Sequence, residues 1–142
     1  MITYFSLEWQ DWSCHPGDAL SSTLLIISGS KKKVTYGELD GRGNILFQQD
    51  GPLQASDGGT FFALVERIIE QWGDQTDFCV PVCDGSCWKI KVRYNRGKTL
   101  KYTGTVAYPP DGQALERALQ ALCDSAGIHP KYYFGCCDFA DD

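Results

Sequence analysis

The 142-residue sequence predicts a single α+β domain in which two amphipathic helices pack on one face of a largely antiparallel β-sheet. The first observation is that apolar and basic side chains alternate within residues 84–108, as they do in a β-hairpin. The other two are apolar residues at three- and four-residue spacing, which predict helices at about 60–72 and 111–126. No linker or repeat divides the chain, so we expect residues 1–142 to form one domain.

The hairpin is the strongest pattern in the chain. Successive side chains of a strand point to opposite faces, so its first strand separates into an apolar and a basic row. The rows are Trp88, Ile90, Val92 and Tyr94 on one face, and Lys89, Lys91 and Arg93 on the other. Residues 95–97 supply the turn, and the return strand adds Lys101 to the basic face. Gly104 interrupts the apolar row, which predicts a bulge or a close contact with a neighbouring element.

Strands are also expected ahead of the first helix. Residues 2–9 predict a strand with aromatic side chains on both faces, and residues 23–28, rich in Leu and Ile, predict a buried strand. Residues 34–38 and 44–49 flank the turn signal of residues 40–43, which indicates a second hairpin. The expected order is therefore strands, helix, hairpin and helix.

Both predicted helices carry signals at their ends. Thr60 is the candidate N-cap of the first, and Gly73 is a natural stop. Asp111 is the candidate N-cap of the second, which Gly127 should end. Each helix has one apolar stripe, which indicates that it covers a face of the sheet.

Composition and charge exclude several classes of protein. The net charge of −5 argues against a dedicated nucleic-acid binder. No apolar stretch approaches the roughly 20 residues that cross a bilayer. Residues 1–12 lack the basic and apolar regions of a signal peptide. We therefore expect a cytoplasmic protein that does not enter a membrane.

The segment from Asp84 to Leu122 resembles the C-terminal part of small uncharacterised bacterial proteins of unknown function. The residues that carry the resemblance are Asp84-Gly85, Trp88, Ile90, Val92, Tyr94, Gly97-Lys98, Gly104 and Tyr108-Pro109, followed by an amphipathic helix. The resemblance implies a bacterial, intracellular α+β domain and transfers no catalytic residue. The chain departs from this pattern in its richness in cysteine.

The seven cysteines are the residues best able to carry chemistry. Their odd number, without a secretion signal, favours reduced thiols over a disulfide framework. Cys79, Cys83 and Cys87 form a C-x3-C-x3-C series and are candidate zinc ligands, although structural zinc sites usually use C-x2-C spacing. A fourth ligand would come from Cys14-His15, Cys123, His129 or Cys136-Cys137. We favour the alternative, in which the thiols are small buried hydrophobic groups and no cofactor is bound.

Catalytic constellations are not found in the sequence. Cys14 and His15 are adjacent, which normally splays two side chains apart instead of pairing them. Neither a G-x-S-x-G nucleophile elbow nor a Walker-type phosphate loop is present. The sequence therefore predicts a protein that is not an enzyme.

The hairpin places a basic surface on an acidic protein. Between Gly85 and Pro110 there is no acidic residue, whereas six of the thirteen Lys and Arg residues fall there. The candidate binding residues are Lys89, Lys91, Arg93 and Lys101. They would attract an acidic protein partner. The alternative is the ordinary wet face of an antiparallel sheet, on which lysine is common.

Two hypotheses for function follow. The first is a small cytosolic protein-interaction module, of the immunity, inhibitor or accessory type, that acts by surface complementarity. The second is a structural zinc-binding or thiol-dependent domain that uses Cys79, Cys83 and Cys87. Nucleic acid is not the expected partner, because Tyr94 and Tyr102 fall on the apolar face and cannot stack on bases.

Overall fold

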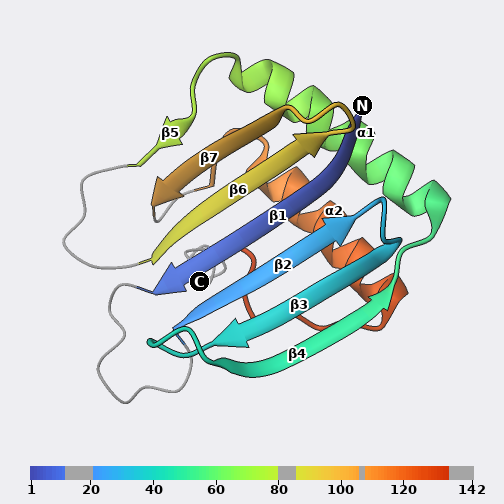
Figure 1. Ribbon diagram of the computed structural model, residues 1–142. Helices are drawn as coiled ribbons and strands as arrows, with labels where there is room; N and C mark the ends of the chain where they lie inside the picture. Colours follow the sequence, from blue (N-terminus) through green and yellow to red (C-terminus); the bar gives the residue numbers. More distant parts are fainter. Residues whose placement is uncertain (12–20, 80–85, 106–107, 135–142) are drawn as a thin grey trace.

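The structure, a computed structural model, describes residues 1–11, 21–79, 86–105 and 108–134. The elements run in the order β1 (Ile2–Asp11), β2 (Ser22–Ser28), β3 (Lys33–Leu39), β4 (Ile45–Pro52), α1 (Ala55–Trp72), β5 (Asp77–Phe78), β6 (Ser86–Tyr94), β7 (Thr99–Thr105) and α2 (Gly112–Ala126). Figure 1 shows them in chain order.

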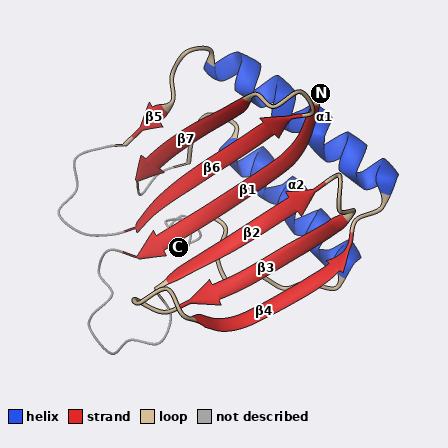
Figure 2. Ribbon diagram, viewed as in Figure 1, coloured by secondary structure: helices blue, strands red, loops and turns tan. Residues whose placement is uncertain are grey.

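The strands form one seven-stranded sheet in the order β4-β3-β2-β1-β6-β7-β5. All neighbouring pairs are antiparallel except β5 with β7, which run parallel. Both helices lie on the same face of the sheet, and no described element covers the other face (Figure 2). The predicted α+β class, with a largely antiparallel sheet and two helices on one face, is confirmed.

The core lies between the sheet and the two helices. From β1 the side chains of Phe5, Leu7 and Trp9 point into it, each at most 5% exposed. The ring of Phe5 meets that of Phe61 on α1 edge to face, with centroids 5.2 Å apart. On α2, Leu119 is fully buried. Each buried side chain of this size contributes about 1.5–3 kcal/mol, so this layer supplies the main driving force for folding.

The predicted basic hairpin is present as β6 and β7. Its turn contains Gly97 at a φ of 88°, a conformation that glycine adopts without steric cost. In the register, Ile90 lies opposite Tyr102 and Trp88 opposite Gly104. The indole of Trp88 occupies the place where a side chain at position 104 would stand. The interruption of the apolar row is therefore a close contact, one of the two outcomes that the sequence predicts.

Helix α1 begins earlier than the sequence predicts. Thr60 was the expected cap, but the helix starts at Ala55 after the N-cap residue Gln54, and Thr60 is an exposed residue within it. Gly58 is buried in the first turns, where a Cβ would lie 3.1 Å from Leu53. Packing of the backbone against Leu53 therefore offsets the poor helix propensity of glycine. The predicted ends at Gly73 and Gly127 are confirmed. Asp111 stands in the N-cap position of α2, but its backbone is left-handed with a φ of 61° and its side chain makes no capping hydrogen bond.

Strand β2 is not uniformly buried, so the expectation of a buried strand is wrong in part. Leu25 and Ile27 face the core, whereas Leu24 and Ile26 are half-buried on the uncovered face of the sheet. An antiparallel sheet with helices on one side leaves alternate residues of every strand on the other side. Leu24 and Ile26 thus bring apolar surface to the uncovered face.

The segment after α2 returns across the helix side of the sheet and closes the core. The ring of Phe134 lies 5.5 Å from that of Trp88, and Tyr132 stacks on Trp9 with centroids 4.3 Å apart. Phe134 is fully buried, so residues 131–134 are part of the fold. The sequence showed only an aromatic cluster at this point.

We expect Gly104→Ala to lower the free energy of unfolding by about 1–3 kcal/mol, because the added methyl group would overlap the Trp88 indole. Urea unfolding followed by tryptophan fluorescence measures the change. Gly59→Ala is the matched control, since no atom lies near its Cβ position and the site is helical. The control should gain about 0.5–1 kcal/mol. Equal effects at the two sites would contradict the packing described for Gly104.

Candidate functional site

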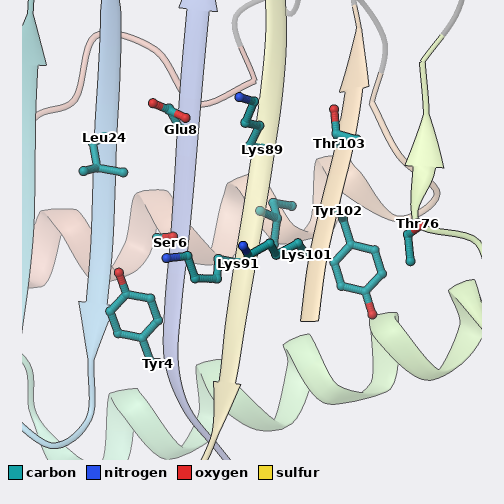
Figure 3. Close-up of a pocket in the computed structure, with 11 residues that line it drawn as sticks. Tyr4, Ser6, Glu8, Leu24, Thr76, Lys89, Lys91, Lys101, Tyr102 and Thr103 are labelled. Carbon is teal, nitrogen blue, oxygen red and sulfur yellow. The ribbon is translucent and has the colours of Figure 1, made fainter. Parts of the chain in front are cut away.

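The uncovered face of the sheet is hollowed over its centre. The hollow has a volume of about 540 Å³. Its described lining residues are Tyr4, Ser6, Glu8, Leu24, Thr76, Lys89, Ile90, Lys91, Lys101, Tyr102 and Thr103. Figure 3 shows the lysines on the side of the sheet away from the helices. The hollow therefore lies over the basic hairpin, the adjacent strand β1 and the next strand β2, with Thr76 at the side of β7.

The strand register sets the spacing of the cationic groups. Lys91 lies between Ser6 on β1 and Lys101 on β7, and the two lysines are direct cross-strand partners. In the next row, Lys89 lies between Glu8 and Thr103. Like charges directly opposite one another destabilise an antiparallel pair. The Lys91–Lys101 pair is thus an unfavourable arrangement that a bound anionic group would relieve.

Arg93 extends the basic row along β6. It pairs with Tyr4 in the register, and its guanidinium carbon lies 4.4 Å from the centroid of the Tyr4 ring. This cation–π contact holds the guanidinium against the uncovered face of the sheet. All four candidate residues, Lys89, Lys91, Arg93 and Lys101, thus lie on the uncovered face, where the alternation places them.

The opposite face of the same hairpin explains this placement. Trp88, Ile90 and Val92 are each at most 2% exposed against the helices. Tyr102 also points toward the helix side (Figure 3), where burial raises the pKa of its hydroxyl. A shift of one residue in register would exchange these groups with the lysines, at the cost of most of the core. The position of the cations is therefore fixed by the packing of the apolar row.

The positive charge of the hollow is little compensated. Lys89, Arg93 and Lys101 are exposed and Lys91 is half-buried. Within the described ranges no carboxylate forms an ion pair with any of them. Glu8 is the one carboxylate among the described lining residues. The hollow can thus attract an anionic group from solution.

Sequence reasoning missed the half of the hollow that comes from β1 and β2. Tyr4, Ser6 and Glu8 line it from β1, and Leu24 lines it from β2. The signal was present, because residues 2–9 alternate with Phe5, Leu7 and Trp9 on the core side. What the sequence did not supply was the pairing of β1 with β6, which brings Tyr4 beside Arg93.

The candidate zinc ligands are only partly described. Cys79 is exposed, with Sγ 3.7 Å from the Thr103 hydroxyl oxygen, and Cys87 is buried, with its thiol donating to Gln10 Oε1 at 3.5 Å. Cys83 lies outside the described residues, as do Cys14-His15 and Cys136-Cys137 among the candidate fourth ligands. In the described part of the chain no three His, Cys, Asp or Glu side chains gather as metal ligands do.

Two of the described thiols, Cys79 and Cys123, have a raised pKa, which favours their protonated form. A hydrogen bond with Asp77 raises the pKa of the Cys79 thiol, and the same contact lowers the pKa of the Asp77 carboxyl. Burial raises the pKa of the Cys123 thiol to about 11. Because the thiolate is the nucleophile and the metal ligand, these shifts oppose both roles at neutral pH.

Comparison with known proteins leaves the chain unassigned: no protein-family model matches it, and no curated protein matches it. The resemblance of Asp84 to Leu122 to bacterial proteins therefore stays a prediction. Across the described ranges, neither helix has the length and apolar character that a bilayer-spanning helix requires.

We expect Asp77→Asn to speed the alkylation of Cys79 by iodoacetamide at neutral pH. The asparagine still accepts from the Cys79 amide, but it removes the carboxylate that raises the thiol pKa through its hydrogen bond and its charge, so the thiolate forms at a lower pH. Peptide mass spectrometry across a pH series measures the rate, with Asp74→Asn as the exposed control. Unchanged rates would contradict the assignment to Asp77. A faster reaction after a chelator alone would favour the zinc hypothesis instead.

Proposed function

We propose that the protein is a small interaction module that binds an acidic protein partner through the uncovered face of its sheet. The observation that carries the proposal is the pair Lys91 and Lys101, opposed across two strands with no described carboxylate paired to either. An acidic side chain placed between them would stabilise both. Lys89 and Arg93 lengthen the basic surface along β6. A partner with several carboxylates is therefore attracted more strongly than one with a single carboxylate.

The apolar residues beside the cations favour a protein partner over a nucleic acid. Leu24 and Ile26 are half-buried on the same face as the basic row, on the far side of β1, and protein interfaces combine such apolar patches with charged residues. A stacking platform for bases is not offered by Tyr94 and Tyr102, which lie on the helix side of the sheet. The ring of Tyr4 already carries the Arg93 guanidinium. The chain as a whole has a net charge of −5, which opposes binding to a polyanion.

The proposed mode of action is surface complementarity, as in immunity, inhibitor and accessory proteins. It needs a preformed face, and the hairpin provides one because the core beneath it fixes the backbone positions and the side from which the cations project. We propose a bacterial cytoplasmic location. It agrees with the odd number of cysteines, which favours reduced thiols, and with the resemblance of residues 84–122. The zinc alternative depends on Cys83, outside the described residues, and gains no support from the raised pKa of the Cys79 thiol.

We expect the triple variant Lys89→Glu, Lys91→Glu and Arg93→Glu to lose partner binding by roughly tenfold or more, because it replaces attraction by repulsion. The measurement is affinity capture from the native host, followed by titration calorimetry with the purified acidic partner. Raising the salt concentration should weaken binding of the unmodified protein.

The matched control is Lys31→Glu, Arg67→Glu and Arg117→Glu, which changes the net charge equally at exposed positions away from the hollow. It should retain the partner. Thermal unfolding confirms that both variants are folded. Equal loss in the two triple variants, or retention in both, would contradict a role for the uncovered face, as would capture of nucleic acid alone.

A further inference from the structure

The hollow on the uncovered face has the dimensions of a small-molecule site. Its volume of about 540 Å³ falls within the roughly 300–1,000 Å³ that is usual for pockets that hold small ligands. It extends from Leu24 on β2 to Lys101 on β7, which is roughly 14 Å at about 4.8 Å between neighbouring strands. Along β1 it runs from Tyr4 to Glu8, roughly 13 Å. A protein interface usually covers about 800 Å² on each side, far more than this footprint. The hollow by itself therefore fits a small molecule.

The positive charge of the hollow is concentrated at one end. Among the described lining residues three lysines stand against one glutamate, which leaves a net charge of +2. That glutamate, Glu8, is the cross-strand neighbour of Lys89, so it balances this lysine more than the other two. Lys91 and Lys101 face each other on β6 and β7, and no described carboxylate is paired with either. The uncompensated charge therefore lies at the Lys91–Lys101 pair.

The side chains of the lysines converge on the middle of the hollow. Figure 3 shows the ammonium groups of Lys89, Lys91 and Lys101 on the β1 side of the strands that carry them. Tyr4 and Ser6 add hydroxyl groups from β1 itself. An ammonium group donates three hydrogen bonds and accepts none. The middle of the hollow is therefore rich in donors, and it suits a group whose atoms mainly accept.

We propose that the hollow binds a small phosphate monoester, with its phosphate group between Lys91 and Lys101. A phosphate monoester carries a charge of about −1.5 to −2 at pH 7, which matches the net charge of +2 on the described lining. Its terminal oxygens are three strong acceptors, and charge-assisted hydrogen bonds from lysine to phosphate are among the stronger ones. A carboxylate brings one charge and two oxygens, so it leaves one of the two opposed lysines uncompensated.

The organic part of the ester lies across β1 against Leu24. This side chain is half-buried and borders the hollow on β2, at the end away from the Lys91–Lys101 pair. An apolar or aromatic group placed there removes apolar surface from water. Glu8 pairs with Leu24 in the register and repels a second anionic group at this end. The hollow therefore selects esters that carry one phosphate and an uncharged body.

Binding of such an ester does not depend on the proposed protein partner and is measured without it. The two would compete for Lys91 and Lys101, because both use the same cations. An acidic partner that binds while the ester does not would therefore contradict the small-molecule site alone.

The test is a titration of the full chain with phenyl phosphate, followed by the amide chemical shifts in nuclear magnetic resonance spectra. We expect saturable shifts at the residues that line the hollow. Binding should be roughly tenfold tighter or more than that of benzoate, which has the same ring and one charge, and tighter than that of inorganic phosphate, which lacks the ring.

Lys101→Met should weaken the binding of phenyl phosphate by roughly tenfold or more, because it removes one of the two opposed charges and keeps a side chain of similar length. Lys101 is exposed, so the variant leaves the core intact. Lys31→Met is the matched control at an exposed position outside the lining, and it should bind as the unmodified protein does. Leu24→Ala should weaken the binding of phenyl phosphate and leave that of inorganic phosphate unchanged.

Two kinds of result would overturn the assignment of the hollow to a phosphate monoester. One is the absence of saturable shifts, or equal affinity for benzoate and phenyl phosphate. The other is equal loss in Lys101→Met and Lys31→Met. A phosphotyrosine peptide, which carries the same phenyl phosphate group, separates the two sources of that group. Peptide binding that is no tighter supports a small molecule, whereas tighter binding would assign the hollow to a phosphorylated protein and overturn the small-molecule site.

Discussion

The pairing of β1 with β6 is the interaction on which the rest of the structure depends. β1 is the central strand of the sheet, held by β2 on one side and by β6 on the other. It joins the N-terminal strands to a hairpin that follows much later in the chain. On its core side it sets Leu7 opposite Ile90, and on its uncovered side it sets Glu8 opposite Lys89. One register therefore builds both the core and the hollow.

The same constraint connects stability with the proposed function. Each apolar side chain of β6 that packs against the helices obliges its neighbours to face solvent. The sheet thus fixes the backbone positions from which the cations project. The Lys91–Lys101 pair is a local cost to the sheet, which the burial of Trp88, Ile90 and Val92 outweighs by a wide margin. Under the proposed function, an acidic partner would supply the missing negative charge.

The sequence predicts the elements better than their arrangement, because periodicity is local and strand order is not. The alternation of apolar and basic residues around Trp88 is sufficient to predict the hairpin. The apolar stripe that ends at Trp72 is sufficient to predict most of α1. The first turns of α1 were not predicted, because Gly58 and Gly59 have a low helix propensity. The contact of Gly58 with Leu53, which compensates for it, cannot be seen in the local sequence pattern. β5 is too short to show a period. The basic face of the hairpin was predicted, but the hollow was not, because the place of Tyr4 and Glu8 beside the lysines depends on a long-range pairing.

Native-state hydrogen exchange tests most directly whether β1 and β6 form one cooperative unit. The structure predicts that the paired amides of Ile2–Asp11 and Ser86–Tyr94 exchange only through global unfolding, with the same free energy of opening in both strands. Amides of β6 and β7 that exchange through a cheaper opening, while β1, β2 and β3 remain protected, would contradict it. The hairpin would then be a separate unit, and its cations would not be held against β1.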